Sequence, residues 1–152
     1  MSDERIWNAV VEAIKTERSA MYFYQRAAFR MRDKRARQIF LKLAEEEREH
    51  AECFLEIYQG TDIPDLTEHL QEQDLTSEWL LELDGLLDGE FDDVQALQLA
   101  MLKEKHLERQ LRQIAGTISD PAIRTVYEVN ADSTRQHFVL IEKEFQRLTG
   151  LP

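Results

Sequence analysis

The chain has a single cysteine, which limits both its folding and its chemistry. Cys53 has no partner for a disulfide within the sequence, and no Cys-x-x-Cys pair is present. Cysteine-ligated zinc, sulfur-ligated iron and thiol exchange between paired cysteines are therefore excluded for this chain. The simplest interpretation of Cys53 is a small core residue.

Glycine and proline are also scarce, with five Gly and three Pro in 152 residues. So few turn signals leave room for long helices, which the abundant Leu, Ala, Glu, Gln, Arg and Lys favour. Hydrophobic residues make up 43% of the chain and charged residues 32%, a balance that is typical of globular proteins. We expect one all-α domain over residues 1–152.

Positive charge is in short supply, because 19 Lys and Arg face 30 Asp and Glu, giving a net charge of -11. Such a charge disfavours nucleic acid and anionic membranes as partners and favours cations. Apolar runs of about 18 residues are absent, as is a basic segment followed by an apolar one at the start. We expect no membrane association and a cytoplasmic location.

Apolar residues recur at spacings of three and four in two predicted helices that form a hairpin. The first runs from about Asp3 to Arg32, and the second follows an N-cap at Asp33 and ends at Gly60. The positions predicted to face the bundle interior are Ile6, Val10, Ala13, Glu17, Ala20, Tyr24, Ala27 and Met31, then Ala36, Phe40, Leu43, Glu47, His50, Phe54 and Ile57.

Two further helices form a second predicted hairpin after a long crossover from Thr61 to Asp93, within which Ser77 to Leu87 can form a short helix. Asp92 and Asp93 can cap the third helix, Gly116 closes it, and Asp120-Pro121 begins the fourth. Their interior positions are Leu97, Ala100, Glu104, Leu107, Leu111 and Ile114, then Ile123, Tyr127, Asn130, Thr134, His137, Ile141 and Leu148. Two antiparallel hairpins joined by a long crossover make a four-helix bundle.

Charged and polar groups occupy the middle of each interior stripe, where packing alone would place Leu or Ile. They are Glu17, Glu47, His50, Glu104 and His137. Buried carboxylates without a partner are costly, and several facing one another repel, so a cation is expected among them. Carboxylate and imidazole ligands suit iron first, with manganese and zinc as alternatives.

The sequence resembles the ferritin-like, rubrerythrin-type di-iron carboxylate family over nearly its whole length. The resemblance is carried by Glu17 seven residues before Tyr24, by LAEEEREHAECF and by DDVQALQLAMLKEKHLERQL. It implies a ferritin-like bundle and a dimetal site with one Glu from each of two helices and Glu-x-x-His from each of the others. By position, Glu17 and Glu104 match the lone glutamates, and Glu47 with His50 matches one Glu-x-x-His element.

The fourth helix departs from this pattern, because Thr134 stands where the family has glutamate, while His137 matches. Three carboxylates leave two divalent ions with one excess positive charge, and a single ion with one excess negative charge. A hydroxide or another anion, Glu108, or the amide oxygen of Asn130 could complete a dimetal site; otherwise the chain holds one metal.

The resemblance implies an iron protein that reacts with peroxide or dioxygen, as a peroxidase or an iron oxidiser, and a homodimer. Because rubredoxin-like cysteines are lacking, turnover would need a separate electron donor. The alternatives are a bundle that binds or stores metal without catalysis, and a metal-free interaction protein. Some residues have simpler interpretations: Tyr24 as core more than as a site residue, Trp7, Trp79, Phe23, Phe40 and Phe54 as packing or interface residues, and His69 and His106 as ordinary histidines.

Overall fold

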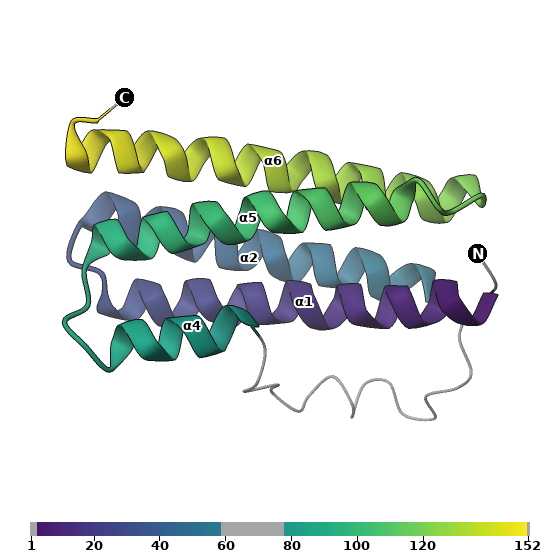
Figure 1. Ribbon diagram of the computed structural model, residues 1–152, viewed down its shortest axis with the longest axis horizontal. Helices are drawn as coiled ribbons and strands as arrows, with labels where there is room; N and C mark the ends of the chain where they lie inside the picture. The colour runs from purple at the N-terminus through teal and green to yellow at the C-terminus, as the bar shows by residue number, and fades with distance from the viewer. Residues whose placement is uncertain (1–2, 59–77, 152) are drawn as a thin grey trace.

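The computed structural model describes residues 3–58 and 78–151, and these residues form five helices. Four of the helices are long and lie side by side, and the fifth is short (Figure 1). Their bounds are α1 Asp3–Arg30, α2 Lys34–Ile57, α4 Glu78–Leu87, α5 Asp93–Ala115 and α6 Pro121–Thr149. The helix α2 ends at Ile57, with Tyr58 as its C-cap, before the predicted end at Gly60. Gly60 itself, His69 and most of the crossover lie outside the described residues.

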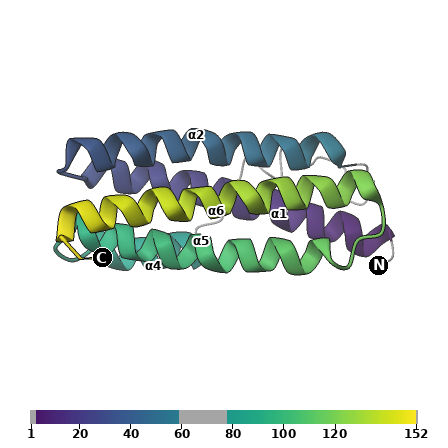
Figure 2. The same ribbon diagram turned by 90° about the horizontal axis from the view of Figure 1, so that it is seen from above.

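The long helices are arranged as two antiparallel hairpins, α1 with α2 and α5 with α6 (Figures 1 and 2). The two helices of each hairpin pack closely along their length, and the hairpins meet mainly through α2 and α6. The short helix α4 packs chiefly on α1, and also touches α5. The predicted ferritin-like four-helix bundle is confirmed.

Three aspartates begin helices as the sequence predicts, because each side chain accepts hydrogen bonds from amides that have no partner within the first turn. Asp33 caps α2 through the amide of Ala36, while Asp92 and Asp120 cap α5 and α6. At the far end of α6, Gly150 has a φ of 72°, a left-handed conformation that suits glycine. The starts of α2, α5 and α6 and the end of α6 therefore follow from local sequence.

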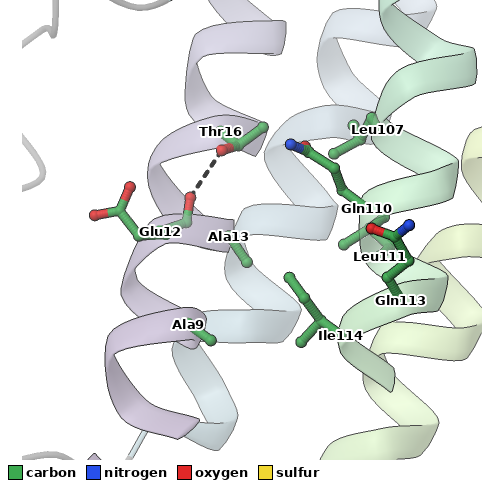
Figure 3. A pocket seen from close by; sticks show the side chains of 9 residues that line it. All are labelled: Ala9, Glu12, Ala13, Thr16, Leu107, Gln110, Leu111, Gln113 and Ile114. Carbon is green, nitrogen blue, oxygen red and sulfur yellow. Dashed lines mark hydrogen bonds between the residues drawn. The ribbon is translucent and has the colours of Figure 1, made fainter. Parts of the chain in front are cut away.

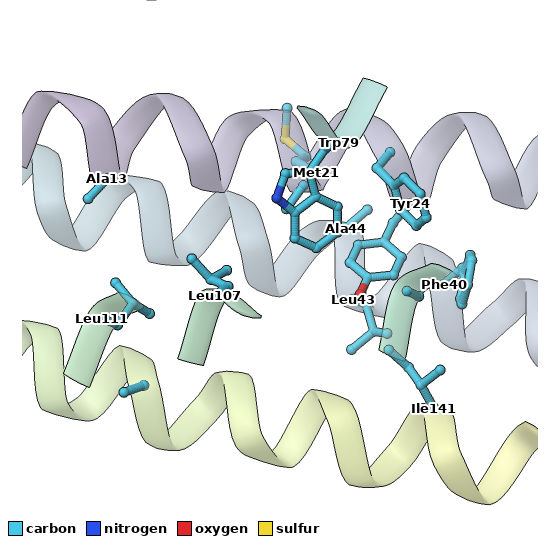
Figure 4. Packing of buried hydrophobic residues seen from close by; sticks show 14 of the residues in the cluster. Ala13, Met21, Tyr24, Phe40, Leu43, Ala44, Trp79, Leu107, Leu111 and Ile141 are labelled. Atoms are coloured by element: carbon cyan, nitrogen blue, oxygen red, sulfur yellow. The ribbon is translucent and has the colours of Figure 1, made fainter. Parts of the chain in front are cut away.

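Aromatic side chains fill the bundle on the α4 side, at the height where α4 meets α1 (Figure 4). Trp79 of α4 lies with its ring centroid 5.2 Å from that of Phe23 and 6.0 Å from that of Tyr24. Tyr24 in turn packs edge-on against Phe40 of α2 at 4.9 Å. The crossover helix thus closes the core beside the middle of α1, and the prediction of Phe23, Phe40, Phe54 and Trp79 as packing residues holds.

Two other details differ from the sequence prediction. The helix α1 ends at Arg30 instead of Arg32, because the backbone amides of Arg32 and Asp33 donate to the carboxylate of Asp93, at the start of α5. Cys53 is exposed and is not a core residue; it directly precedes the buried Phe54 and so lies on a different face of α2. Among the helices of the described residues, none is long and apolar enough to cross a membrane.

Candidate metal centre

Five polar side chains from all four long helices meet in the middle of the bundle. Glu17 comes from α1, Glu47 and His50 from α2, Glu104 from α5 and His137 from α6. The three glutamates are 0% exposed, and the two histidines are 7% and 3% exposed. The sequence predicted this set, and the structure brings all five together.

These side chains form two groups of potential ligands that share one residue. Glu17, Glu47 and His50 make the first group, and Glu47, Glu104 and His137 make the second. Within each group the ligand atoms lie within 4.8 Å of one another. Each group therefore offers two carboxylates and one imidazole, and Glu47 is in position to bridge two cations.

The two carboxylate oxygens of Glu47 face different ligand groups. Its Oε2 lies 3.6 Å from Nδ1 of His50, and its Oε1 lies 2.8 Å from Nδ1 of His137. The same Nδ1 atoms lie 3.4 Å from Glu17 and 3.6 Å from Glu104, respectively. The two imidazole rings stack nearly parallel, with centroids 5.3 Å apart. Both histidines thus present Nδ1 to the carboxylates.

Many polar atoms of this cluster make no hydrogen bond of acceptable geometry among the described residues, although several lie within ion-pair distance of one another. They are both oxygens of Glu17 and of Glu47, Oε2 of Glu104, Nδ1 of His50 and both ring nitrogens of His137. Buried polar atoms are almost always satisfied in folded proteins, so such a concentration calls for a bound partner. Oxygen and imidazole donors without thiolates suit iron, manganese or zinc, and the residues fit a two-metal centre of that kind.

Without bound metal, four of the five residues of the cluster have raised pKa values, and Glu47 has a lowered one. Burial, reinforced by the negative charge of Glu47, raises the pKa of Glu104 to about 7 and raises that of Glu17 as well. Although burial opposes it, contact with the carboxylates raises the pKa of His50 to about 11 and that of His137 to about 10. Burial acts against ionisation of Glu47 too, but its contacts with Glu17 and the imidazoles hold its pKa below the ordinary value.

Three residues around the cluster contact it from outside. Tyr24 donates a hydrogen bond from Oη to Oε1 of Glu104 at 2.5 Å. Ser133 Oγ lies 2.8 Å from Nε2 of His50, and Glu46 Oε2 lies 3.2 Å from Nε2 of His137. Such contacts orient ligands and tune the metals they bind. The sequence favours a core role for Tyr24 over a site role, and it gives no signal for Ser133 or Glu46.

Glu108 and Asn130, the two residues that could replace the missing carboxylate at position 134, are both engaged in other contacts. Thr134 is buried and donates its hydroxyl to the carbonyl of Asn130, whose amide nitrogen donates to the carbonyl of Val126. Glu108 pairs with Arg112 at 2.8 Å and belongs to neither ligand group. His106 is exposed, in line with its ordinary interpretation.

A groove lies between α1 and α5 (Figure 3). It has a volume of about 470 Å³ and is lined mainly by small and apolar residues, including Ala9, Ala13 and Leu111. Thr16 and Leu107 line it too. Thr16 directly precedes Glu17, and Leu107 lies one turn beyond Glu104.

Comparison with known protein families adds a finding to this geometry. The family model described as Rubrerythrin matches residues 8–146. This chain belongs to the rubrerythrin family. The match spans all five residues of the metal centre, so a di-iron type of metal-binding protein is supported both by the family and by the two ligand groups. No curated protein and no solved structure matches the chain.

Proposed function

We propose that this rubrerythrin-family protein binds two iron ions between its helices and uses them to reduce peroxide or to react with dioxygen. The observation that carries the proposal is the pair of Glu-Glu-His groups sharing Glu47, buried at the centre of the bundle. Two complete groups with a shared carboxylate support a pair of neighbouring ions over a single one.

In this proposal each residue has a defined task. Glu17 and His50 would hold one ion and Glu104 and His137 the other, and Glu47 would serve both, since it belongs to both ligand groups. Full burial of the three glutamates keeps bulk water away, which strengthens every electrostatic contact inside the site. Tyr24 fixes the orientation of Glu104 through its hydrogen bond.

The chemistry requires two electrons per turnover. Reduction of one hydrogen peroxide to two waters consumes two electrons and two protons, and two ferrous ions, when bound, would supply the electrons. The chain has only one cysteine, so a separate electron donor would return the ions to the ferrous state. A homodimer and a cytoplasmic location also remain proposals.

Elemental analysis after anaerobic ferrous loading and removal of excess metal is the direct test. We expect two irons per chain, oxidation of both by one equivalent of peroxide, and a second cycle after chemical reduction. Fewer than two irons would contradict the two-metal centre. Two irons that do not react with peroxide or dioxygen would contradict the redox function while leaving metal binding in place.

Thr134 favours a second candidate function, metal binding or storage without catalysis. Its hydroxyl is committed to the carbonyl of Asn130, so α6 contributes only His137 to the two ligand groups. Zinc or iron would then stabilise the bundle without redox turnover. The two functions separate on peroxide reactivity. A melting temperature unchanged by chelator and by added iron would contradict both and favour a metal-free interaction protein.

A further inference from the structure

We propose that Glu46 supplies the fourth negative charge of the metal centre, acting through His137 in place of the carboxylate that position 134 lacks. This inference rests on the proposed two-metal function. It assigns Glu46 as a positioning residue that binds no metal itself.

The two nitrogens of His137 face different surroundings. Nδ1 is directed at Glu47 and Glu104, while Nε2 lies 3.2 Å from Oε2 of Glu46 and has no hydrogen bond within the described residues. If Nδ1 binds a cation, the ring proton must be on Nε2. A carboxylate beside that proton fixes the tautomer and makes the imidazole a more basic ligand.

His50 offers an internal comparison, because its Nε2 lies 2.8 Å from the neutral hydroxyl of Ser133. The partners are placed reciprocally: Glu46 precedes Glu47 on α2 and contacts the histidine of α6, and Ser133 precedes Thr134 on α6 and contacts the histidine of α2. Only the partner of His137 carries charge. Glu46, the additional carboxylate of α2, therefore lies beside the histidine of α6, the helix that has Thr134 where the family has glutamate.

The charge count supports the same assignment. Glu17, Glu47 and Glu104 leave two divalent ions with one excess positive charge, and Glu46 brings the total to neutrality. The other acidic candidate, Glu108, is already paired with Arg112 and lies 3.9 Å from Arg135. Because the Glu46 side chain is 35% exposed, solvent screens its charge, and we expect a weakened site when it is removed, not a lost one.

Anaerobic titration with cobalt(II), a spectroscopically visible divalent ion, tests the inference with Glu46→Gln. Glutamine keeps the shape and an acceptor oxygen but removes the charge. The matched control is Glu49→Gln, on the same helix and exposed. We expect two cobalt ions in the parent chain and in Glu49→Gln, and in Glu46→Gln a 10- to 100-fold loss of affinity at one site only.

Proton NMR of the cobalt-loaded proteins identifies which site has changed. The exchangeable Nε2 proton of His137 should shift in Glu46→Gln, while that of His50 should not. Adding Thr134→Glu to Glu46→Gln should restore tight binding of the second ion. Equal cobalt affinities in Glu46→Gln and Glu49→Gln would overturn the role of Glu46 and would leave the two-metal function in place. A parent chain that binds fewer than two cobalt ions would overturn the two-metal function and this inference with it.

Discussion

Tyr24 and Glu104 are joined across the bundle by a hydrogen bond of 2.5 Å from the phenol to the carboxyl group. The bond links α1 with α5, two helices that belong to different hairpins. Tyr24 is fully buried among Phe23, Phe40 and Trp79. One side chain thus packs the core and orients a residue of the metal centre.

Replacing Tyr24 by Phe removes the donor and should raise the pKa of Glu104 further, because this hydrogen bond favours the charged carboxylate. In the metal-free protein we expect a loss of about 1–3 kcal/mol in unfolding free energy at pH 8, where Glu104 is largely ionised, and a smaller loss at pH 5. Urea denaturation at both pH values measures this. Tyr22→Phe is the control, since its hydroxyl accepts only a 3.3 Å hydrogen bond from Arg18; an equal loss in the control would contradict the prediction.

The sharing of Glu47 between the two ligand groups predicts an unequal set of amide variants. Glu17→Gln should weaken only the ion bound with His50, and Glu104→Gln only the ion bound with His137. Glu47→Gln should weaken both. Cobalt stoichiometry and affinity at fixed pH distinguish the three variants. If Glu47→Gln retained one ion at full affinity, the carboxylate would not be shared.

Metal binding should release protons, because the ligands must lose those that they hold in the metal-free state. At pH 7 both histidines are protonated and Glu104 is about half protonated, given the pKa of about 7 for Glu104 and those of about 11 and 10 for the histidines. The pKa of Glu17 is raised by burial and by the charge of Glu47. We expect more than two protons released per pair of ions, two from the histidines and about half of one from Glu104. Calorimetric titration in buffers of different ionisation enthalpy counts them, and metal affinity should rise with pH.

The stability of the metal-free chain should change with pH in the opposite direction. Groups whose folded pKa is raised hold protons that the unfolded chain gives up, so their stabilisation is lost as the pH rises through the folded pKa. For Glu104 this window lies between 4.5 and about 7, and for His50 between 6.5 and about 11. We expect the melting temperature to fall between pH 6 and 9. Glu47 has a lowered pKa, so its contribution to stability changes only at lower pH. A variant with both histidines replaced by Gln should show a shallower fall.

In the proposed function, peroxide would need a path to the buried cluster, and we test the groove between α1 and α5, which Ala13 lines, as that path. Ala13→Phe puts a ring into the groove one turn from Glu17. We expect the rate of peroxide reaction to fall severalfold while iron content stays at the parental value. Thr16→Val, with nearly the same volume, is the matched control. An unchanged rate in Ala13→Phe would exclude the groove as the route.

The four long helices, their caps and the five central residues could all be predicted from the sequence, because each depends on local spacing. Glu47 and His50, for example, interrupt an apolar stripe at positions three apart. The end of α1 could not be predicted, since it depends on Asp93, about 60 residues further along the chain. Spacing within one helix contains no information on such a contact.

Glu46 and Ser133 escaped prediction for a related reason. Each precedes an interior position by one residue, which turns its side chain toward the neighbouring helix and away from the bundle axis. In the sequence Glu46 is indistinguishable from Glu45 and Glu49, although Glu45 pairs with Arg48 at the surface. Only the relative rotation of α2 and α6 separates it from them.

The division of the ligands between the hairpins also bears on the order in which the protein assembles. Glu17, Glu47 and His50 all belong to α1 and α2, so the first hairpin carries one whole group by itself, whereas the second group needs Glu47 together with α5 and α6. A nascent chain could capture its first ion once α2 has been synthesised. In the two-metal proposal, the second ion would link the two hairpins, and it would be the first to leave when the hairpins separate.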